Sequence, residues 1–301
     1  MAGGMVGAVY PHRAVSTQVN PGSTFTRRTP RRTVIKPSHG WTGLRLPELW
    51  NYRELIGFLV WRDLKVRYRQ TVFGVAWVLL QPLALMVVFA LFLGEFLHVK
   101  TGDVPYPVFV FAGLVPWTLF SQALMASSAS LVANAGLLGK IYFPRLLLPV
   151  SAVGSYVLDF LISSVLLVGL MLVYGVALSP ALLIIPLLGV LVVFAVLGVG
   201  ILLSAVNVKY RDVQSGVPLL VQLWLFASPI AYPATLVPEA YRNIYALNPM
   251  VSIVGLFRWA TVDSEPPTLA MVEVSIVAIA LLLAVGLGYF RRTERTFADV
   301  I

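Results

Sequence analysis

Apolar residues occupy most of the chain in long stretches, and six of these are long enough to cross a membrane. A helix needs about 20 apolar residues to span the hydrocarbon core of a bilayer. The stretches are residues 72–96, 107–132, 146–176, 181–206, 217–237 and 269–290. The third is long enough to tilt or to extend past the bilayer. The pattern predicts an all-α membrane protein with six transmembrane helices.

The distribution of basic residues predicts how these helices are oriented. A basic run from Arg62 to Gln70 ends just before the first apolar stretch. Near the membrane, thirteen Lys and Arg residues lie on the side of the N-terminus and three lie in the loops on the opposite side. Because an excess of Lys and Arg marks the cytoplasmic side of a membrane protein, both termini are expected in the cytoplasm.

Residues 46–70 have the periodicity of an amphipathic helix. The apolar face carries Leu49, Tyr52, Ile56, Leu59, Val60 and Leu64. The opposite face carries Glu54, Arg62, Lys65 and Arg69. The seam becomes polar at Asp63 and Arg67, as expected where a helix leaves the membrane surface. These residues predict a helix in the cytoplasmic interface, although an anchor that only sets the topology is compatible with the same pattern.

The helix at 46–70 and the membrane domain at 71–295 lie between two polar ends. Residues 1–45 are rich in Pro, Thr, Arg and Gly without apolar periodicity, which predicts a disordered basic cytoplasmic tail. This tail lacks the apolar core of a signal peptide, so neither cleavage nor secretion is expected. Residues 296–301 are expected to form a short cytoplasmic C-terminal tail.

Composition supports the membrane assignment and excludes several other classes. Only 12% of the residues are charged, about half the usual share in soluble domains, and the mean hydropathy is +0.86. The net charge of +9 is concentrated on the cytoplasmic flank, which favours membrane lipids over nucleic acid as its partner. Without cysteine there can be neither disulfides nor thiolate metal sites. His12, His39 and His98 are scattered, so no metal site is expected.

The segment at 238–267 is apolar in patches but does not fit a seventh full span. Arg242, Pro249 and Arg258 interrupt it. Irregular backbone of this kind is tolerated at membrane depth only where protein or water surrounds it. We expect short re-entrant or interfacial helices before the last span, and an ordinary outer loop is the alternative.

Few residues in the spans suggest catalysis. Asp159 and Glu273 are the clearest intramembrane acids, and Glu95 lies at the outer end of the first span. Acids in a span are functional candidates by default. No nearby His or Ser completes a catalytic set, so hydrogen bonds to neighbouring helices or a wet passage explain these acids better than catalysis. The closest string to a phosphate-binding loop, at 134–141, lacks its first Gly and its final Ser or Thr, so any ATP would be hydrolysed by another chain.

Aromatic and basic residues gather in places that suit a partner or a sugar. The inner loop at 134–149 combines prolines with Lys140, Ile141, Tyr142, Phe143 and Arg145. A loop that needed only solvation would not expose Ile141, Tyr142 and Phe143, so this exposed patch suits docking to a cytoplasmic partner, and anchoring at lipid headgroups is the alternative. Aromatic faces bind sugars, and candidates for a sugar path are Trp77, Trp224, Phe226 and Tyr232. For any single one of them, an interfacial belt or packing against lipid is the better explanation.

Several strings in this order resemble the permease subunits of type-2 ABC exporters that move bacterial surface polysaccharides such as O-antigen, capsule and teichoic acid. The resemblance covers about residues 48–295. Its strings are RDLKVRYRQTVFG at 62–74, KIYFPR at 140–145, NVKYRDV at 207–213, SPIAY at 228–232 and LNPM at 247–250. Further matching positions are Trp77, Gln81, Pro82, Pro149, Asp159, Phe160 and Arg258.

The resemblance implies a homodimer in the bacterial inner membrane, bound to two cytoplasmic ATPase subunits that would hold ATP and Mg. The substrate would be a lipid-linked polysaccharide, which places the protein in lipopolysaccharide biosynthesis. Contact with the ATPase is implied for Arg62, Lys65 and Arg67 and for the loop at 134–149, as a coupling helix. Short gate helices near the outer face are implied for 238–260, with Tyr241, Tyr245, Asn248, Pro249 and Arg258.

Two other functions remain open on the residues alone. A type-2 permease for a drug or small lipid would share the same topology. An integral membrane glycosyl- or acyltransferase would need a catalytic set, for which only Asp159 and Glu273 are available. We therefore expect a transport permease with no cofactor of its own.

Overall fold

The computed structural model describes residues 50–69, 76–99, 101–102, 104–140, 143–294 and 297, and all structural statements refer to these residues. They form helices and no β-strand. The predicted tail at 1–45 and nearly all of the predicted tail at 296–301 lie outside them. The main helices are α2 (Arg53–Arg69), α3 (Ala76–Phe89), α4 (Tyr106–Ala133), α5 (Ala135–Leu138), α6 (Leu147–Val173), α7 (Ile185–Lys209), α8 (Val213–Phe226), α9 (Glu239–Tyr245), α10 (Pro249–Val262) and α11 (Leu269–Glu294).

Five helical segments are long and apolar enough to cross a membrane. They are α3 continued by the π-helical turn η1 (Ala90–Phe96), α4, α6, α7 preceded by the 3₁₀ turn η2 (Pro180–Ile184), and α11. Five of the six predicted spans are therefore confirmed as membrane-length helices.

The predicted span at 217–237 is not one continuous helix. Its helix, α8, has 14 residues and ends at Phe226. At 1.5 Å per residue this covers about 21 Å, which is short of the roughly 30 Å hydrocarbon core. Pro229 has no N–H to continue the helical hydrogen bonds, and it disfavours the α conformation in the residue before it. The chain then turns through η3 (Ala234–Leu236) into α9.

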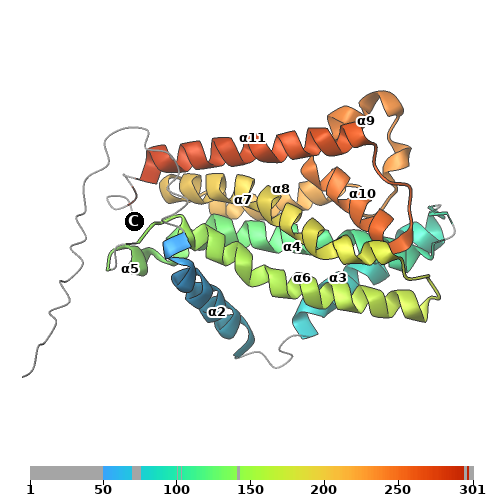
Figure 1. Ribbon diagram of the computed structural model, residues 1–301, viewed down its shortest axis with the longest axis horizontal. Coiled ribbons are helices and arrows are strands. Elements are labelled where there is room, and N and C mark those ends of the chain that lie inside the picture. The colour runs from blue at the N-terminus through green and yellow to red at the C-terminus, as the bar shows by residue number, and fades with distance from the viewer. Residues whose placement is uncertain are drawn as a thin grey trace, which may run out of the picture. The chain divides into compact units, whose positions relative to one another are not determined.

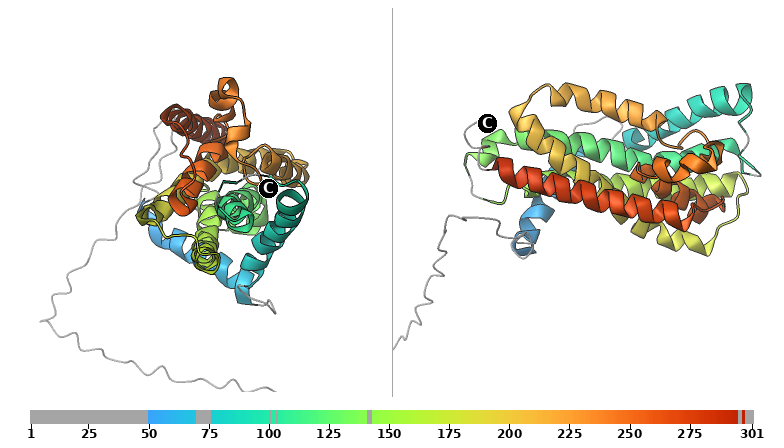
Figure 2. Two further views of the ribbon diagram at one scale, coloured as in Figure 1. Left: turned by 90° about the vertical axis from the view of Figure 1, so that its right-hand side faces the viewer. Right: turned by 90° about the horizontal axis from the view of Figure 1, so that it is seen from above.

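Helix α4 lies at the centre of the bundle, with α6 and α7 packed against it (Figures 1 and 2). Small residues let the neighbouring helices approach closely. Gly189 of α7 lies under the ring of Phe160, and Gly200 of α7 lies against Ser127 of α4. Gly286 of α11 is in direct contact with the backbone of Gly198 in α7. The sequence therefore packs α4, α6, α7 and α11 through glycine as much as through large apolar side chains.

The end of the bundle that carries α2 and α5, called here the α2 end, has its own apolar core (Figure 1). This cluster comprises Leu59, Leu131, Phe143, Leu147, Leu148, Ile201, Ala205, Val208, Phe290 and Phe297. Tyr52 and Ile56 of the predicted apolar face pack on it together with Leu55, so this part of the face lies against the protein. The prediction that Phe143 is exposed is wrong, because it is 6% exposed and fills this core.

The opposite end carries α9 and α10 and is called here the α9 end. Helix α9 has seven residues, and α10 has fourteen, most of them buried. Asp263 ends α10 in the left-handed conformation with φ 52°, which Asp adopts more readily than most residues. The segment between α8 and α11 thus contains two α-helices joined by turns, and of these α10 is packed into the bundle.

Candidate functional site: two polar networks and a groove

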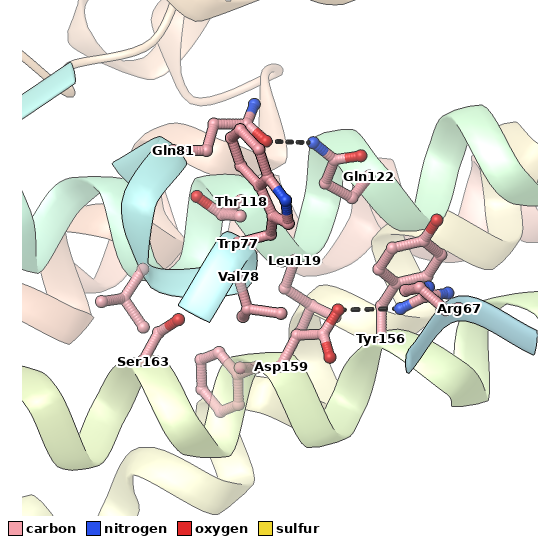
Figure 3. A pocket seen from close by; sticks show the side chains of 12 residues that line it. Arg67, Trp77, Val78, Gln81, Thr118, Leu119, Gln122, Tyr156, Asp159 and Ser163 are labelled. Carbon is pink, nitrogen blue, oxygen red and sulfur yellow. Dashed lines mark hydrogen bonds and ion pairs between the residues drawn. The ribbon is translucent and has the colours of Figure 1, made fainter. Parts of the chain in front are cut away.

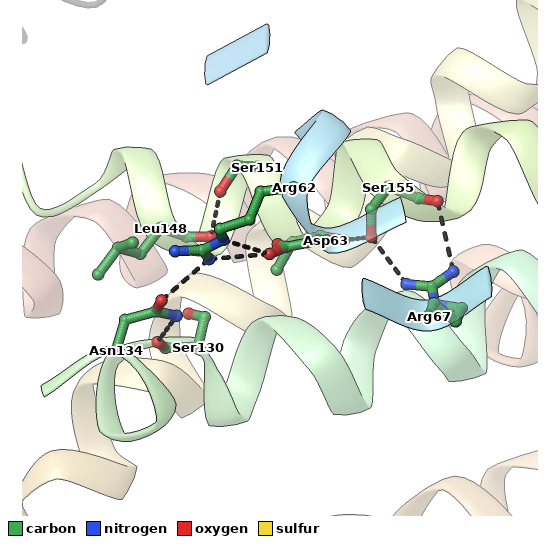
Figure 4. A network of polar contacts seen from close by, with 9 residues as sticks. Arg62, Asp63, Arg67, Ser130, Asn134, Leu148, Ser151 and Ser155 are labelled. Atoms are coloured by element: carbon green, nitrogen blue, oxygen red, sulfur yellow. Dashed lines mark hydrogen bonds and ion pairs between the residues drawn. The ribbon is translucent and has the colours of Figure 1, made fainter. Parts of the chain in front are cut away.

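Helix α2 is held to α6 by an ion pair, Arg67 with Asp159. The Nη1 atom of Arg67 lies 2.8 Å from Oδ2 of Asp159 (Figure 3). Nη2 of the same guanidinium donates to Oγ of Ser155 at 2.9 Å (Figure 4), and the guanidinium lies 3.7 Å from the centroid of the Tyr156 ring. The carboxylate is the more deeply buried partner, with side-chain exposures of 9% for Asp159 and 27% for Arg67.

Tyr68 adds a second donor to the same carboxylate. Its hydroxyl donates to Oδ1 of Asp159. Burial, and then this hydrogen bond, raise the pKa of Tyr68 above its ordinary value, so the phenol remains a donor at physiological pH. The expectation that Asp159 bonds to a neighbouring helix is confirmed, and the polar seam of α2 at Arg67 has a physical cause, a buried carboxylate that needs a cation.

A second link ties α2 to the junction between α4 and α5. Arg62 donates from Nε and Nη2 to Oδ1 of Asp63, at 3.0 and 2.8 Å, and from Nη2 to Oδ1 of Asn134 at 3.0 Å (Figure 4). The Asn134 amide in turn donates to the Ser130 carbonyl at 2.8 Å. Asn134 lies between the last residue of α4 and the first of α5, so this bond joins α2 directly to the junction.

The residues expected to dock a partner are in mixed environments. Lys65 and Lys140 are exposed. Ile141 and Tyr142 lie outside the described residues. Arg145 donates to the backbone carbonyl of Glu294, and its guanidinium lies 5.8 Å from the centroid of the Phe297 ring. Arg145 is therefore tied to the end of α11, in addition to any role at the surface.

A groove opens beside the Arg67–Asp159 pair, between α3, α4 and α6 (Figure 3). Its lining includes Arg67, Trp77, Val78, Gln81, Thr118, Leu119, Gln122, Tyr156, Asp159 and Ser163. The Nε2 atom of Gln122 donates to Oε1 of Gln81 at 2.9 Å. The cavity has a volume of about 160 Å³, below the roughly 300–1,000 Å³ of typical ligand pockets. It has room for one small group and none for a polymer.

The four aromatic residues expected to line a sugar path divide into two pairs. Trp77 lines the groove and is 53% exposed, and Phe226 is 63% exposed at the end of α8. Trp224 instead donates from Nε1 to Oδ1 of Asn248 at 2.8 Å and packs edge-on against Phe120. The Tyr232 hydroxyl lies 3.0 Å from that of Tyr245. Trp224 and Tyr232 are thus engaged in holding the α9 end together.

Asn248 is the centre of this second network. Its amide donates to Oγ of Ser228 at 2.9 Å and to the Ala227 carbonyl at 3.0 Å, and its Oδ1 accepts from the backbone N–H of Met250 at 3.1 Å. The last contact caps the N-terminus of α10. One side chain therefore joins the end of α8 to the start of α10.

Arg258 of α10 is 3% exposed and has no acidic partner among the described residues. Its guanidinium donates instead to four backbone carbonyls, those of Phe109, Pro229, Ile230 and Tyr232. It also lies 3.6 Å from the centroid of the Phe109 ring. Because an unsatisfied buried polar group costs about 1–3 kcal/mol, this arrangement stabilises both the cation and the non-helical backbone at 229–232.

The remaining predicted gate residues and acids are placed as follows. Tyr241 is 62% exposed, whereas Pro249 is buried at the first position of α10. Glu273 is exposed and lies about one turn from the start of α11. It lies within the membrane-length segment Leu269–Glu294, so its role as an intramembrane acid stays a prediction.

Sequence reasoning missed Tyr68, Ser155, Asn134 and the Gln81–Gln122 pair. Only the glutamines had a usable signal. Gln81 is the only amide residue between Ala76 and Phe96, and Gln122 is the only one in α4. A lone amide in an apolar span is expensive and needs a polar partner.

Comparison with known proteins identifies similar chains over nearly the whole described region. The family model of the ABC-2 type transporter matches residues 54–262, from α2 to the end of α10. The O-antigen export system permease protein RfbA of Myxococcus xanthus is 33% identical over 261 residues, which cover 84% of this chain and 98% of that protein. RfbA of Klebsiella pneumoniae is 30% identical over 251 residues, or 82% and 95%. The polysialic acid transport protein KpsM of Escherichia coli is 26% identical over 239 residues, or 77% and 91%.

Proposed function

Because the chain belongs to the ABC-2 type transporter family, we propose that it is the permease subunit of an ATP-driven exporter of a lipid-linked bacterial surface polysaccharide. The observation that carries the proposal is near full-length similarity to permeases named for two different glycans, O-antigen and polysialic acid. The expectation of a transport permease rather than an enzyme is confirmed by these relatives. No relative favours a drug permease or a transferase.

Permeases of this family work with a separate ATP-binding subunit, on which we place ATP and Mg. We propose that this partner docks at the α2 end, on the exposed Lys65 and Lys140 and on the segment at 134–149. The Arg62–Asn134 bond supports the proposal, since it joins the helix that would touch the partner to the segment that would couple it. In this arrangement the α2 end faces the cytoplasm, with residues 1–45 and 296–301 as cytoplasmic tails.

One chain does not provide a cavity large enough to enclose the proposed substrate. A cavity of about 160 Å³ cannot enclose a polymer. We propose a homodimer with two ATP-binding subunits, in which the path runs between the copies. Two exposed aromatic side chains, Trp77 on α3 and Phe226 on α8, would line such a path. The short α8, with the turn that follows it, would make the sixth crossing.

At the α9 end we propose that α9 and α10 are re-entrant gate helices near the outer face. The buried Arg258 supports this role, because it fixes the non-helical backbone at 229–232 that lets the chain turn back. Tyr241, exposed on α9, is the side chain of this region best placed to meet a leaving polymer.

Deletion of the gene tests the proposed function. A deletion strain is expected to accumulate lipid-linked glycan on the cytoplasmic side and to lose its surface glycan, and the wild-type gene restores export. An intact surface coat in the deletion strain would refute the proposal. The orientation is tested separately: the chain contains no cysteine, so Lys140→Cys should react with an impermeant thiol reagent only from the cytoplasmic side.

Coupling through α2 has its own test. Arg62→Met is expected to lower stimulation of the partner's ATPase activity by substrate severalfold, with the permease dimer intact, because α2 loses its bond to Asn134. Arg53→Met is the matched control, since Arg53 lies exposed on the same helix and its contacts are local: a 3.5 Å hydrogen bond to the Trp50 carbonyl and a guanidinium 5.7 Å from the centroid of the Trp50 ring. Equal stimulation in the two variants would remove Arg62 from the coupling route.

A further inference from the structure

The Gln81–Gln122 pair in the groove has no role in the function proposed above. The two residues are 41 positions apart and come from different helices, α3 and α4 (Figure 3). Gln81 is exposed, and it lies in the predominantly apolar, membrane-length segment Ala76–Phe96. An exposed amide at this depth is unfavourable unless something polar faces it.

The hydrogen bonds of the pair are incomplete. A primary amide has two N–H donors and a carbonyl oxygen with two lone pairs. The single bond uses one donor of Gln122 and one lone pair of Gln81, and no other hydrogen bond to either amide is found among the described residues. Three N–H groups and the Gln122 carbonyl thus have no protein partner in this region. Lipid tails supply none either, so the groove must hold water or a polar ligand.

The other groove residues indicate which ligand. Trp77 precedes Gln81 by one helical turn, so both lie on the same face of α3. The hydroxyls of Thr118 and Ser163 also line the groove. An exposed indole beside amides and hydroxyls suits a sugar ring, whose C–H face packs on the aromatic surface while its hydroxyls bond to the amides.

The charged groups of the groove decide between a sugar and a phosphate. Arg67 is the only cation in the lining, and it already bonds to Asp159 at 2.8 Å and to Ser155 at 2.9 Å. A phosphate would have to displace the Asp159 carboxylate, which would then lie buried without its cation. The groove therefore favours a neutral ligand.

Resting on the proposed export function, we propose that Trp77, Gln81 and Gln122 form a subsite for one neutral, hydroxyl-bearing sugar residue of the passing polysaccharide. The cavity volume of about 160 Å³ fits a single ring better than an oligosaccharide. The subsite would bind the sugar residues of the polysaccharide one at a time and so contribute to selection of the glycan.

Thiol labelling in the cysteine-free chain tests the subsite. Gln81→Cys and Gln122→Cys are made singly and treated in membranes with a cationic, impermeant thiol reagent. The matched control is Leu281→Cys, which lies mid-helix on α11 with 60% exposure and outside the groove. Labelling at positions 81 and 122 is expected to be at least tenfold faster than at 281. Methyl α-glucoside should slow it severalfold, and inorganic phosphate should leave it unchanged.

Slow labelling at position 81, equal to that at 281, would overturn the subsite, as would protection by phosphate and not by the glycoside. Export supplies the second readout. The double variant Gln81→Leu/Gln122→Leu should lower surface glycan at least tenfold at unchanged protein level, whereas Gln81→Ser, which keeps a polar group, should retain part of it. If wild type and the double variant restore export equally to a deletion strain, the subsite is wrong and the proposed function stands. If the wild type restores none, both are wrong.

Discussion

Replacing Arg67 with Leu is expected to destabilise the protein by about 3 kcal/mol. The change leaves the Asp159 carboxylate, with 9% exposure, facing only the Tyr68 hydroxyl and no cation. Removing one partner of a buried ion pair costs about 3–5 kcal/mol, and we take the lower end because the 27% exposure of Arg67 lets water approach. Asp159→Leu should lower the stability less, by about 1–2 kcal/mol. The residue left without its partner is then Arg67, the more exposed member of the pair.

A double-mutant cycle measures whether the two residues act together. The double variant Arg67→Leu/Asp159→Leu leaves neither charge unpaired, so its loss should not exceed that of Arg67→Leu alone. The expected coupling energy is then about 1–2 kcal/mol, well above the 0.3–0.5 kcal/mol within which independent sites add. The assay is reversible unfolding of the purified protein in mixed micelles, with the four proteins compared under the same conditions.

The chain offers a control pair for this cycle. Arg242 and Glu239 lie 3.7 Å apart on α9, three residues from each other, and Glu239 is 89% exposed. Pairs of this kind contribute little, so their cycle should show coupling close to zero. If the stability losses of Arg67→Leu and Asp159→Leu were additive, their coupling energy would be close to zero, as in the control pair. That result would refute the conclusion that the buried pair holds α2 to α6.

Three further predictions use the same unfolding assay. Arg258→Lys should lower stability by at least about 2 kcal/mol, because the ammonium group of Lys cannot reach all four carbonyls that the planar guanidinium of Arg258 contacts. An unchanged unfolding midpoint would contradict this. Phe143→Ala should cost about 3–5 kcal/mol as a core truncation, whereas Tyr241→Ala at an exposed site should stay within about 0.5 kcal/mol; similar losses would show that Phe143 is not part of the core. Gly286→Val should reduce the yield of folded protein because its side chain would meet the α7 backbone, while Gly288→Val, with open space around it, should behave as wild type.

Part of the α2 network was predictable because its signal is local. The apolar periodicity predicted that Tyr52, Ile56 and Leu59 share one face of a helix, whereas the packing of that face against the bundle was not predicted. The same local pattern failed for Phe143, whose neighbours Lys140 and Arg145 suggested an exposed loop. It is buried in a cluster that also contains Phe290 and Phe297, which are far away in the sequence.

The end of the helix within the predicted span at 217–237 was not predictable for a related reason. Its composition is apolar throughout, and apolar composition predicts membrane depth without saying whether the backbone stays helical. Arg258, 28 residues beyond Ile230, supplies the donors that a non-helical turn at this depth needs. No window of the sequence around 217–237 contains that cation.

Length and hydropathy were enough to identify a membrane protein and to locate five of its long helices, since the bilayer imposes both quantities on each helix separately. Which helices meet was settled only when the chain packed. Arg67 and Asp159 are 92 residues apart, and Arg62 and Asn134 are 72 apart. A buried charge or amide needs a specific partner at a specific distance. Because that partner can come from anywhere in the chain, the periodicity within one helix does not predict it.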